Sequence, residues 1–385
     1  MSRLEELIQR YCPDGVEYVK IEDVCKIKTP PCKIQTGSYQ EIGRYPIIDQ
    51  GQKQFAGYTD DEKATLADGE YILYGDHTCI VKYYNGRFAQ GADGLKILTV
   101  QGNNTKYVFY AFCAYNLTNT EYKRHWTQAK EIEIPVPPMP VQEEIVRILD
   151  SFTELQAELQ AELQKRKQQY NYYRDNLLSF SGRPDVKWMK LGDVATDWYR
   201  GAGIKRDEVS EIGMPCIRYG EIHTTYNIWF DKCISHTDET QQPSKKYADY
   251  GDILFAITSE DIPFVGNSVA YIGQERIMVG GDIVVMKHNQ NPKYMSYALS
   301  TTDAVKQKGK GKVKSKVVHT SVPALQEIII PVPSLAEQQE IADILDRFDK
   351  LSNDLTSGLP AEIEKRQQQY EYYRDRLLTF KRKGA

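Results

Sequence analysis

The sequence contains no run of about 18 apolar residues, the length that a bilayer-spanning helix needs. Its first residues, MSRLEELIQRY, also lack the apolar segment of a signal peptide and have the pattern of an amphipathic helix. These absences argue against a membrane-spanning or secreted protein. We therefore expect the chain to work in the cytoplasm.

Cysteine is sparse, and no two cysteines are spaced as a CxxC pair. Zinc sites and disulfide frameworks depend on closely spaced or matched cysteines, so we expect neither here and no metal in this chain. The pattern fits a reducing compartment. The seven cysteines are Cys12, Cys25, Cys32, Cys79, Cys113, Cys216 and Cys233.

Catalytic signatures are missing as well. The sequence has no P-loop, no GxGxxG after a strand, no HExxH and no GxSxG. The prolines of KTPPC and PVPPM do not form the tetrapeptide of base methyltransferases. The two Pro-Asp pairs, at 13–14 and 184–185, lack the following acidic-x-Lys of nucleases, and the six histidines show no ligand spacing. We predict that the chain by itself catalyses no reaction and binds no cofactor.

What the chain does contain is a duplication. KRKQQYNYYRDNLLSF (165–180) returns almost unchanged as KRQQQYEYYRDRLLTF (365–380), an offset of 200 residues. IPVPPMPVQEEIVRILDSF (134–152) returns as IPVPSLAEQQEIADILDRF (330–348), an offset of 196 residues. A weaker match joins PDGVEYVKIEDV (13–24) to PDVKWMKLGDV (184–194). The repeat is too long for a solenoid unit, so we infer a tandem duplication of one domain plus one helix.

The regions between the helical blocks have strand-like runs punctuated by turn residues, such as GEYILYG (69–75) and GDILFAIT (251–258). GLKILTV (94–100) and GDIVVMK (281–287) read the same way. We predict an α+β fold, in which two mixed α/β domains are separated and joined by long helices that form an antiparallel coiled coil with a pseudo-two-fold arrangement. The predicted segments are a first domain with a short N-terminal helix (1–133), a central helix (134–182), a second domain (183–329) and a C-terminal helix (330–385).

Apolar residues in each helical block recur at spacings of three and four, which is typical of a helix that packs on another helix. An ordinary intramolecular core would give the same pattern, but the duplication favours two helices packed antiparallel. The predicted pairing residues are Ile145, Ile148, Phe152, Leu155, Leu159, Tyr170, Tyr173 and Leu177 in the first block, and Ile341, Ile344, Phe348, Leu351, Leu355, Tyr370, Tyr373 and Leu377 in the second.

The length of the helices looks adjustable. The first block contains the run LQAE LQAE LQKR (155–166), and the two offsets differ by four residues. Each four-residue unit lengthens a helix by about 6 Å, which suits a spacer. Gly358 and Pro360 are residues that interrupt helices, so the second block is a candidate for a break. Ser334 is placed to cap that block, with Glu337 three residues later.

Positive charge is concentrated rather than general, since the net charge is −4. In KQKGKGKVKSK (306–316) every second residue is lysine, and an extended chain would align these lysines on one face toward a phosphate backbone. A solvated basic loop without a partner is the alternative. WYRGAGIKR (198–206) and polar turn residues after two strands are further candidates for phosphate and base contacts. The predicted DNA-binding residues are Arg44, Gln50, Gln52, Lys53, Arg87, Lys123, Arg124, Arg200, Lys205, Arg206, Arg218, Lys306, Lys308, Lys310, Lys312, Lys314 and Lys316.

The duplicated IPVPP…QEEIVRILD and IPVPS…EQQEIADILD blocks, the QQYNYYRD and QQYEYYRD helices and two divergent β-rich regions resemble the specificity subunit (HsdS) of type I restriction–modification systems. The resemblance covers the whole chain. It implies that each β-rich region is a target recognition domain that reads one half of a split, asymmetric site in double-stranded DNA. It also implies that the helices set the number of unread base pairs between the halves.

The same resemblance implies partners. Two copies of a methylation subunit (HsdM) would supply S-adenosylmethionine binding and adenine methylation, and a restriction subunit (HsdR), where present, would use ATP and Mg²⁺. Two other interpretations stay open at this point. The chain could be a scaffold that does not bind DNA, or an autonomous two-domain enzyme with an unrecognised site.

Overall fold

The computed structural model describes residues 2–117, 123–313, 316–353 and 359–384. The chain forms two compact units, of which the first comprises Met1–Gln160 together with Ile363–Ala385 and the second comprises Ala161–Glu362. The four predicted segments, with boundaries near 133, 182 and 329, stay a prediction. The compact units instead group each β-rich domain with parts of both helical blocks.

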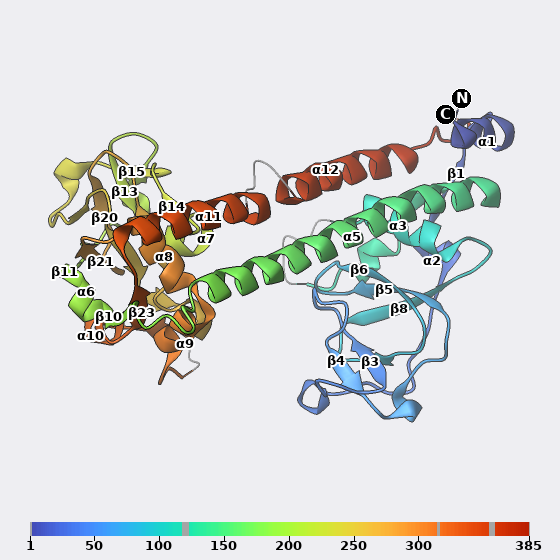
Figure 1. Ribbon diagram of the computed structural model, residues 1–385. Coiled ribbons are helices and arrows are strands. Elements are labelled where there is room, and N and C mark those ends of the chain that lie inside the picture. The colour runs from blue at the N-terminus through green and yellow to red at the C-terminus, as the bar shows by residue number, and fades with distance from the viewer. Residues whose placement is uncertain (1, 118–122, 314–315, 354–358, 385) are drawn as a thin grey trace. The chain divides into compact units, whose positions relative to one another are not determined.

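The first unit holds a β-rich domain between β1 and β9. Its largest sheet has the strand order β2-β8-β5-β6 with antiparallel neighbours, and a smaller sheet has the order β4-β3-β7 (Figure 1). The elements are α1 (Arg3–Tyr11), β1 (Glu17–Lys20), α2 (Ile21–Val24), β2 (Cys25–Ile27), β3 (Tyr45–Ile48), β4 (Gly57–Thr59), β5 (Glu70–Gly75), β6 (Val81–Asn85), β7 (Ala89–Gln90), β8 (Leu95–Val100), α3 (Thr105–Tyr115), α4 (Trp126–Ala129), β9 (Glu133–Val136) and the start of α5 (Met139–Leu177).

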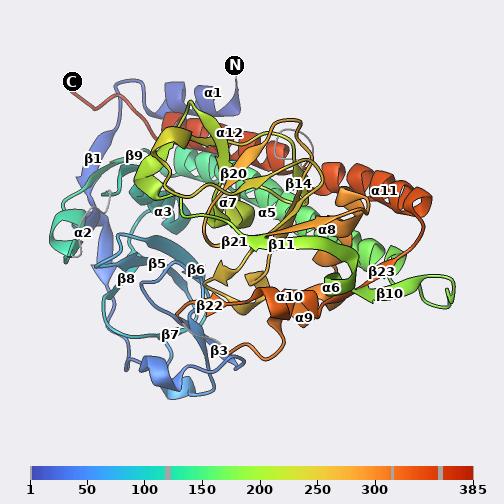
Figure 2. The ribbon, with the colours of Figure 1, turned by 90° about the vertical axis from the view of Figure 1, so that its left-hand side faces the viewer.

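The second unit repeats this plan with more strands. Two five-stranded sheets have the orders β11-β21-β17-β19-β14 and β12-β15-β13-β20-β16 (Figure 2). The elements are β10 (Lys187–Lys190), α6 (Leu191–Val194), β11 (Ala195–Arg200), β12 (Val209–Ser210), β13 (Met214–Ile217), α7 (Tyr219–Thr224), β14 (Trp229–Phe230), β15 (Ser235–Thr237), β16 (Tyr247–Ala248), β17 (Ile253–Ala256), β18 (Thr258–Ser259), β19 (Ser268–Tyr271), β20 (Ile277–Val279), β21 (Ile283–His288), α8 (Pro292–Ser300), α9 (Thr302–Gly309), β22 (Val318–His319), α10 (Val322–Gln326), β23 (Ile329–Val332), α11 (Leu335–Asn353) and the first residues of α12 (Leu359–Leu377).

The two domains are built alike where the sequence predicts it. The four strand-like runs become β5, β8, β17 and β21, and in each domain the two strands are antiparallel neighbours. The short strands β1 and β10 pair antiparallel with β9 and β23, the Pro-containing strands that lead into the long helices. The predicted α+β class and the duplicated plan are therefore confirmed.

A glutamine fastens the start of each long helix to its domain. Gln142 lies in the first turn of α5 and accepts a hydrogen bond from the backbone N–H of Asn104, the N-cap of α3, at 2.9 Å. Gln338 in α11 accepts the same bond from Asn291, the N-cap of α8, also at 2.9 Å. Ser334 caps α11 as predicted, because its Oγ accepts the backbone N–H of Glu337 at 3.3 Å.

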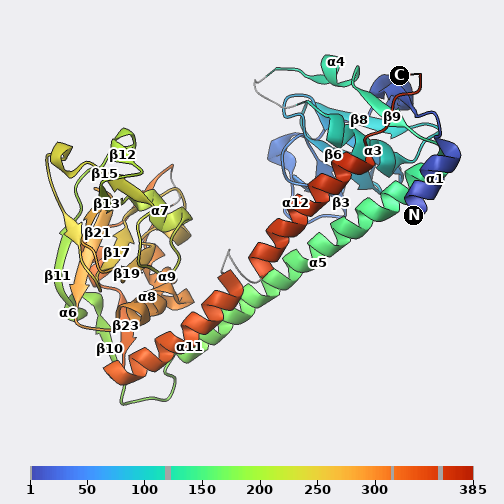
Figure 3. The ribbon, with the colours of Figure 1, turned by 90° about the horizontal axis from the view of Figure 1, so that it is seen from above.

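Within each unit α5 packs against a helix from the other helical block (Figure 3). In the first unit Phe152 stacks on Tyr373 with ring centroids 5.5 Å apart, and Gln156 donates to Gln367. In the second unit Tyr173 stacks on Phe348 at 6.1 Å. The two stacks are equivalent under the duplication, since residue 152 corresponds to 348 and 173 to 373. Residue numbers run in opposite directions along the paired helices, so the pairing is antiparallel.

The other predicted pairing residues divide between this seam and the domain cores. Ile145 and Ile341 are buried in the cores beneath the helices, together with Leu149 and Leu345, because each helix turns one face to its own β-rich domain. Ile344 stays 39% exposed. Leu155, Leu159, Ile148, Tyr370 and Leu377 are half-buried in the first unit, and Tyr170 and Leu177 pack into the second core.

The described residues of the second helical block form α11 and α12. α11 ends at Asn353 and α12 begins at Leu359, so Pro360 lies in the first turn of α12, a position that tolerates proline. Leu355 and Gly358 lie outside the described residues, as does the side chain of Leu351.

The two chain ends meet in the first unit. The backbone of Val16 exchanges hydrogen bonds with Lys381 and Lys383, both at 2.9 Å, and Tyr18 donates to the carbonyl of Phe380. Strand β1 therefore follows the end of α12 in space as β10 follows the end of α5 along the chain. This closes the duplicated plan within the first unit.

Candidate nucleic-acid interface

A cleft of about 950 Å³ opens on the second domain, where three of its turns converge. The turns follow β11, join β13 to α7, and join β20 to β21. Gly201 is required on its floor, because a Cβ there would lie 2.1 Å from the carbonyl oxygen of Gly280. The lining residues are Arg200, Gly201, Gly203, Ile204, Arg206, Arg218, Tyr219, Gly220, Glu221, Thr224, Gly280, Gly281 and Asp282.

Three predicted DNA-binding arginines, Arg200, Arg206 and Arg218, come together in this cleft. The lining also contains two carboxylates, Glu221 and Asp282, so it carries one excess positive charge (3 − 2). Lys205 is absent from the lining and lies 3.5 Å from Glu208. A concave surface that presents three guanidinium groups is suited to accept a phosphate or the edge of a base.

Arg218 is held in place by a buried acid. Glu221 is 5% exposed and accepts the hydroxyl of Ser235 at 2.7 Å, which fixes its carboxylate. The guanidinium of Arg218 lies 3.4 Å from the same carboxylate oxygen, and its backbone N–H donates to the other oxygen at 3.3 Å. A planar guanidinium fixed in this way loses little further rotamer freedom when it binds a ligand. This suits bidentate recognition.

Arg200 is also held in place by neighbouring groups. Its Nη2 donates to Asp282 at 2.7 Å and its Nε donates to the carbonyl of Gly281. Asp282 and the Gly280–Gly281 turn were not predicted from the sequence. The signal was present as GGD between two strand-like runs, where paired glycines mark a close backbone approach.

A second cleft of about 490 Å³ adjoins the first and shares Tyr219, Gly220 and Thr224 with it. It adds His223, whose Nε2 lies 3.0 Å from the carbonyl oxygen of Thr258, and the half-exposed ring of Phe264. Because the two clefts share these residues, we refer to them together as the groove of the second domain.

The lysine run does not form the extended strand that its alternation suggested. Residues 302–309 are the helix α9, so Lys306 and Lys308 point in different directions, and that expectation is wrong for this part of the run. Lys308 is only 6% exposed and donates to Ser268 Oγ at 3.2 Å. Burial lowers the pKa of Lys308 to about 7, and a covered amine of this kind is poorly placed to contact a phosphate.

The remaining lysines of the run lie apart. Lys306 is exposed and lines one pocket together with Asp303. Lys310 and Lys312 line another pocket, of about 390 Å³, together with Lys190. Lys316 is exposed, and Lys314 lies outside the described residues.

In the first domain the predicted residues form one small cluster and several isolated positions. Arg44 and Arg87 both lie over the ring of Tyr45, at 5.1 and 5.9 Å, and Arg87 also pairs with Glu62. Gln50 is engaged within the fold, since its side chain accepts the backbone N–H of His77 at 3.1 Å and donates to a carbonyl. Gln52, Lys53, Lys123 and Arg124 are exposed.

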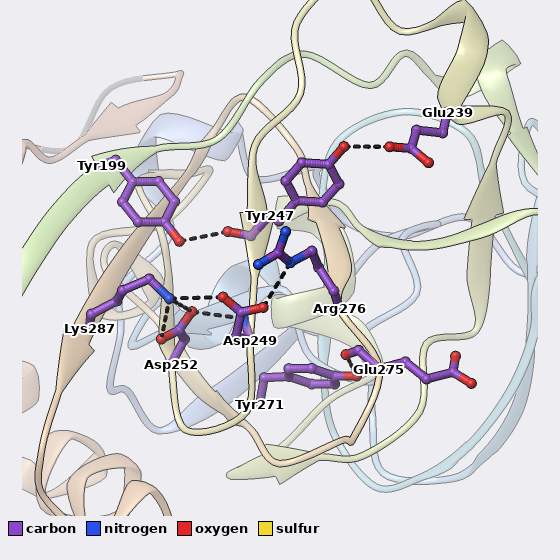
Figure 4. A network of polar contacts seen from close by, with 9 residues as sticks. All are labelled: Tyr199, Glu239, Tyr247, Asp249, Asp252, Tyr271, Glu275, Arg276 and Lys287. Atoms are coloured by element: carbon purple, nitrogen blue, oxygen red, sulfur yellow. Dashed lines mark hydrogen bonds and ion pairs between the residues drawn. The ribbon is translucent and has the colours of Figure 1, made fainter.

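A polar network ties the two five-stranded sheets of the second domain together (Figure 4). Lys287 on β21 donates to Asp249 and Asp252 at 3.1 and 3.0 Å, and Arg276 donates to Asp249 at 2.9 Å. Burial raises the pKa of Asp252. Burial opposes the charge on Lys287, but its bonds to Asp252 and Asp249 outweigh this and raise its pKa. Each group is paired, so the network is a structural link between the two sheets.

Other kinds of site find no support in the part of the chain that the structure describes. The described residues contain no cluster of three or more histidine, cysteine or acidic side chains arranged to hold a metal ion. Within the same residues, no helix is both long and apolar enough to cross a membrane.

The chain is similar in sequence to a known protein family. Two stretches, residues 13–166 and 184–365, match the Type I restriction modification DNA specificity domain. The chain is 31% identical over 401 aligned positions to the Type I restriction enzyme EcoR124I/EcoR124II specificity subunit of Escherichia coli, and the alignment covers 99% of this chain and 97% of that one.

Solved structures show the same fold. The S subunit of a type I restriction-modification system from M. genitalium superposes with a TM-score of 0.53 at 16% identity, covering 94% of this chain and 96% of that one. A chain from a study of complex assembly and conformational transition in a type I R-M system gives a TM-score of 0.57 at 14% identity, with coverages of 95% and 98%.

Proposed function

Since the chain belongs to the type I restriction modification DNA specificity family, we propose that it is the sequence-specific DNA-recognition subunit of a methyltransferase and endonuclease complex. Each β-rich domain reads one half of a bipartite, asymmetric site in double-stranded DNA. The paired helices set the distance between the halves. The chain itself is not an enzyme.

The observation that carries this proposal is the arginine-lined groove of the second domain, set in one of two units that share a plan but differ in surface. Arg218 and its neighbours supply donors suited to base edges and phosphates. The corresponding turn of the first domain, after β3, carries Gln50, whose side chain bonds within the fold, and the exposed Gln52. Different side chains on the same framework are what recognition of two different half-sites requires.

The repeated helices give the proposal its partners. Like surfaces bind like partners, so two copies of a methylation subunit (HsdM) would dock, one on each repeat, and bring S-adenosylmethionine. A restriction subunit (HsdR) with ATP and Mg²⁺ would join where it is present. We place the complex in the cytoplasm, where chromosomal DNA is accessible.

Binding in the presence of the methylation subunit tests the proposal. The co-purified complex should methylate genomic DNA at one bipartite motif, and its affinity for a duplex with that motif should fall steeply as salt rises from about 50 to 200 mM, because phosphate contacts release counterions. Methylome sequencing and fluorescence anisotropy give the two readouts. A complex with no salt-sensitive affinity for any duplex would instead favour a scaffold role.

Two single variants sharpen this experiment. Arg218→Gln should weaken discrimination at bases of one half-site and leave the other half unchanged, since the residue lies in only one domain. Arg276→Gln is the matched control, because that exposed guanidinium pairs with Asp249 and does not line the groove. Equal effects of both variants would contradict the assignment of the groove.

A further inference from the structure

We propose that a duplicated aspartate-centred network, which joins each β-rich domain to the long helix beneath it, fixes the angle of that domain and so restricts the complex to one spacer length. The network of the second unit consists of Asp346, Lys293, Tyr297 and Trp229, and that of the first unit consists of Asp150, Lys106, Tyr110 and Tyr83. This inference rests on the proposed function and concerns how the spacing is enforced.

In the second unit Asp346 of α11 is the centre. Lys293 of α8 pairs with its Oδ2 at 2.6 Å, and the hydroxyl of Tyr297, one turn further along α8, donates to its Oδ1 at 2.7 Å. Trp229 of β14 donates its indole N–H to the same oxygen at 2.9 Å, and the Lys293 ammonium lies 3.9 Å from the centre of the indole ring. Three side chains from two elements of the domain, α8 and β14, therefore converge on one carboxylate of the long helix.

The first unit has a similar arrangement, although its aromatic residue, Tyr83, donates its hydroxyl to Glu70 rather than to the aspartate. Lys106 of α3 pairs with Asp150 Oδ2 of α5 at 2.6 Å, and Tyr110 donates to Oδ1 at 2.8 Å. The Lys106 ammonium lies over the ring of Tyr83 at 5.6 Å from its centre. Each carboxylate is thus bonded to one ammonium and one phenol, with an aromatic face on the ammonium.

The aromatic partner comes from different places in the two domains. Tyr83 is on β6, which pairs with β5. Trp229 is on β14, which pairs with β19. The helix that supplies Lys and Tyr keeps the pattern NTKYVFYA (104–111) and NPKYMSYA (291–298), an internal match of the form NxKYxxYA. The surfaces of the two domains have diverged, yet both retain the bonds from this lysine and this tyrosine to the aspartate. Because these bonds are retained while the domain surfaces differ, we infer that both domains need the same attachment to the helix.

The physical effect is on orientation. The glutamine bonds at the helix start and the hydroxyls of Tyr107 and Tyr294, which donate to Pro135 and Pro331 carbonyls at 2.9 and 2.8 Å, already fix one point of each domain. The aspartate network adds a second point of attachment about two helical turns away, since eight residues separate Gln338 from Asp346. Together with the buried Leu149 and Leu345, these bonds hold each domain at a fixed angle to its helix.

The required stiffness is substantial. A tilt of about 15° displaces a reading residue about 13 Å from the pivot by about 3.4 Å, one base-pair step. A loosened attachment would therefore let a domain reach the neighbouring register. Loss of charge-assisted bonds is the direct way to loosen it.

The test compares spacer profiles. Complexes carrying Asp346→Asn are assayed for methylation of duplexes whose spacer is the native length, or one base pair shorter or longer, with the half-sites unchanged. We expect the rate on off-length duplexes relative to the native one to rise about tenfold or more, the factor that corresponds to losing a charged hydrogen bond. Asp343→Asn is the matched control, because Asp343 is exposed on the same helix and accepts a bond from Gln339 within that helix.

Several outcomes decide the matter. Tyr297→Phe and Tyr110→Phe remove one bond each and keep the ring, so they give the answer in either unit if Asp346→Asn does not assemble. Wild-type spacer profiles in intact complexes of these variants would overturn the inference, as would equal broadening by Asp343→Asn. Absence of any bipartite motif in the wild type would defeat the proposed function instead.

Discussion

His288 shows how a single position couples the fold to pH. It ends β21, and its Nδ1 accepts the backbone N–H of Gln290 at 3.0 Å. Burial lowers the pKa of His288 to about 4, against an ordinary value of 6.5. The folded state therefore binds this proton more weakly than the unfolded state does. The contribution of neutral His288 to the free energy of unfolding is fully present above pH 6.5 and is lost as the pH falls from 6.5 toward 4.

We predict that His288→Asn removes this dependence. The Asn side chain keeps an acceptor for Gln290 but does not titrate, whereas the wild type should lose about 2 kcal/mol of stability between pH 7 and pH 5 from this group. Thermal melting of both proteins at the two pH values measures the difference. If wild type and variant lose stability equally on acidification, His288 does not carry the effect.

At the same scale, residue types were easier to predict than residue environments. Arg200, Arg206 and Arg218 were identified as DNA-binding candidates and meet in one groove, although they are up to 18 positions apart in sequence. Lys308 was counted with the other lysines of its run, and helix α9 buries it. Its burial follows from the packing of α9 on the domain, which no local pattern reports.

Among the elements, α5 is the helix proposed to set the distance between the half-sites. It is a continuous helix of 39 residues, which corresponds to about 58 Å. The LQAE repeats lie near its middle, where Leu155 and Leu159 are half-buried. Four residues turn an α-helix by about 400°, so one unit changes its length by about 6 Å and its phase by only about 40°.

Deletion of Leu155–Glu158 should shift the preferred spacer by about one or two base pairs, because each pair occupies about 3.4 Å. A methylome of cells that express the variant with its methylation partner measures the spacer. The control is Gln156→Ala/Glu158→Ala, which removes the Gln156–Gln367 hydrogen bond but keeps the helix length. Unchanged spacing in the deletion variant would refute the spacer role of this run.

The seam between helices illustrates what an element-level pattern leaves open. The spacing of three and four residues correctly predicted which positions are apolar. It did not distinguish the helix face that packs on the domain core from the face that packs on the paired helix. Ile145 and Ile341 face the domain cores, while Phe152 with Tyr373 and Phe348 with Tyr173 face the paired helix. A helix that packs on both a sheet domain and a helix needs an apolar arc wider than one seam, so periodicity alone assigns too many residues to one partner.

For the whole molecule the proposed role makes one further prediction. The purified chain should transfer no methyl group from S-adenosylmethionine to any duplex, and activity should appear when the methylation subunit is added, because recognition and chemistry reside in different chains. Incorporation of labelled methyl groups into DNA measures both states. Methylation by the chain alone would show that it contains an active site of its own.

The sequence by itself determined the duplication, the strand-rich domains, the long helices and the family, because these depend on local periodicity and on direct similarity between two halves of one chain. The tertiary structure decided which basic residues form a groove, which lysine is buried, and that Asp150 and Asp346 each gather an ammonium and a phenol from elsewhere in the domain. Those facts depend on contacts between residues about 40 to 120 positions apart, and such contacts are set by how sheets, turns and helices pack rather than by any neighbouring residue.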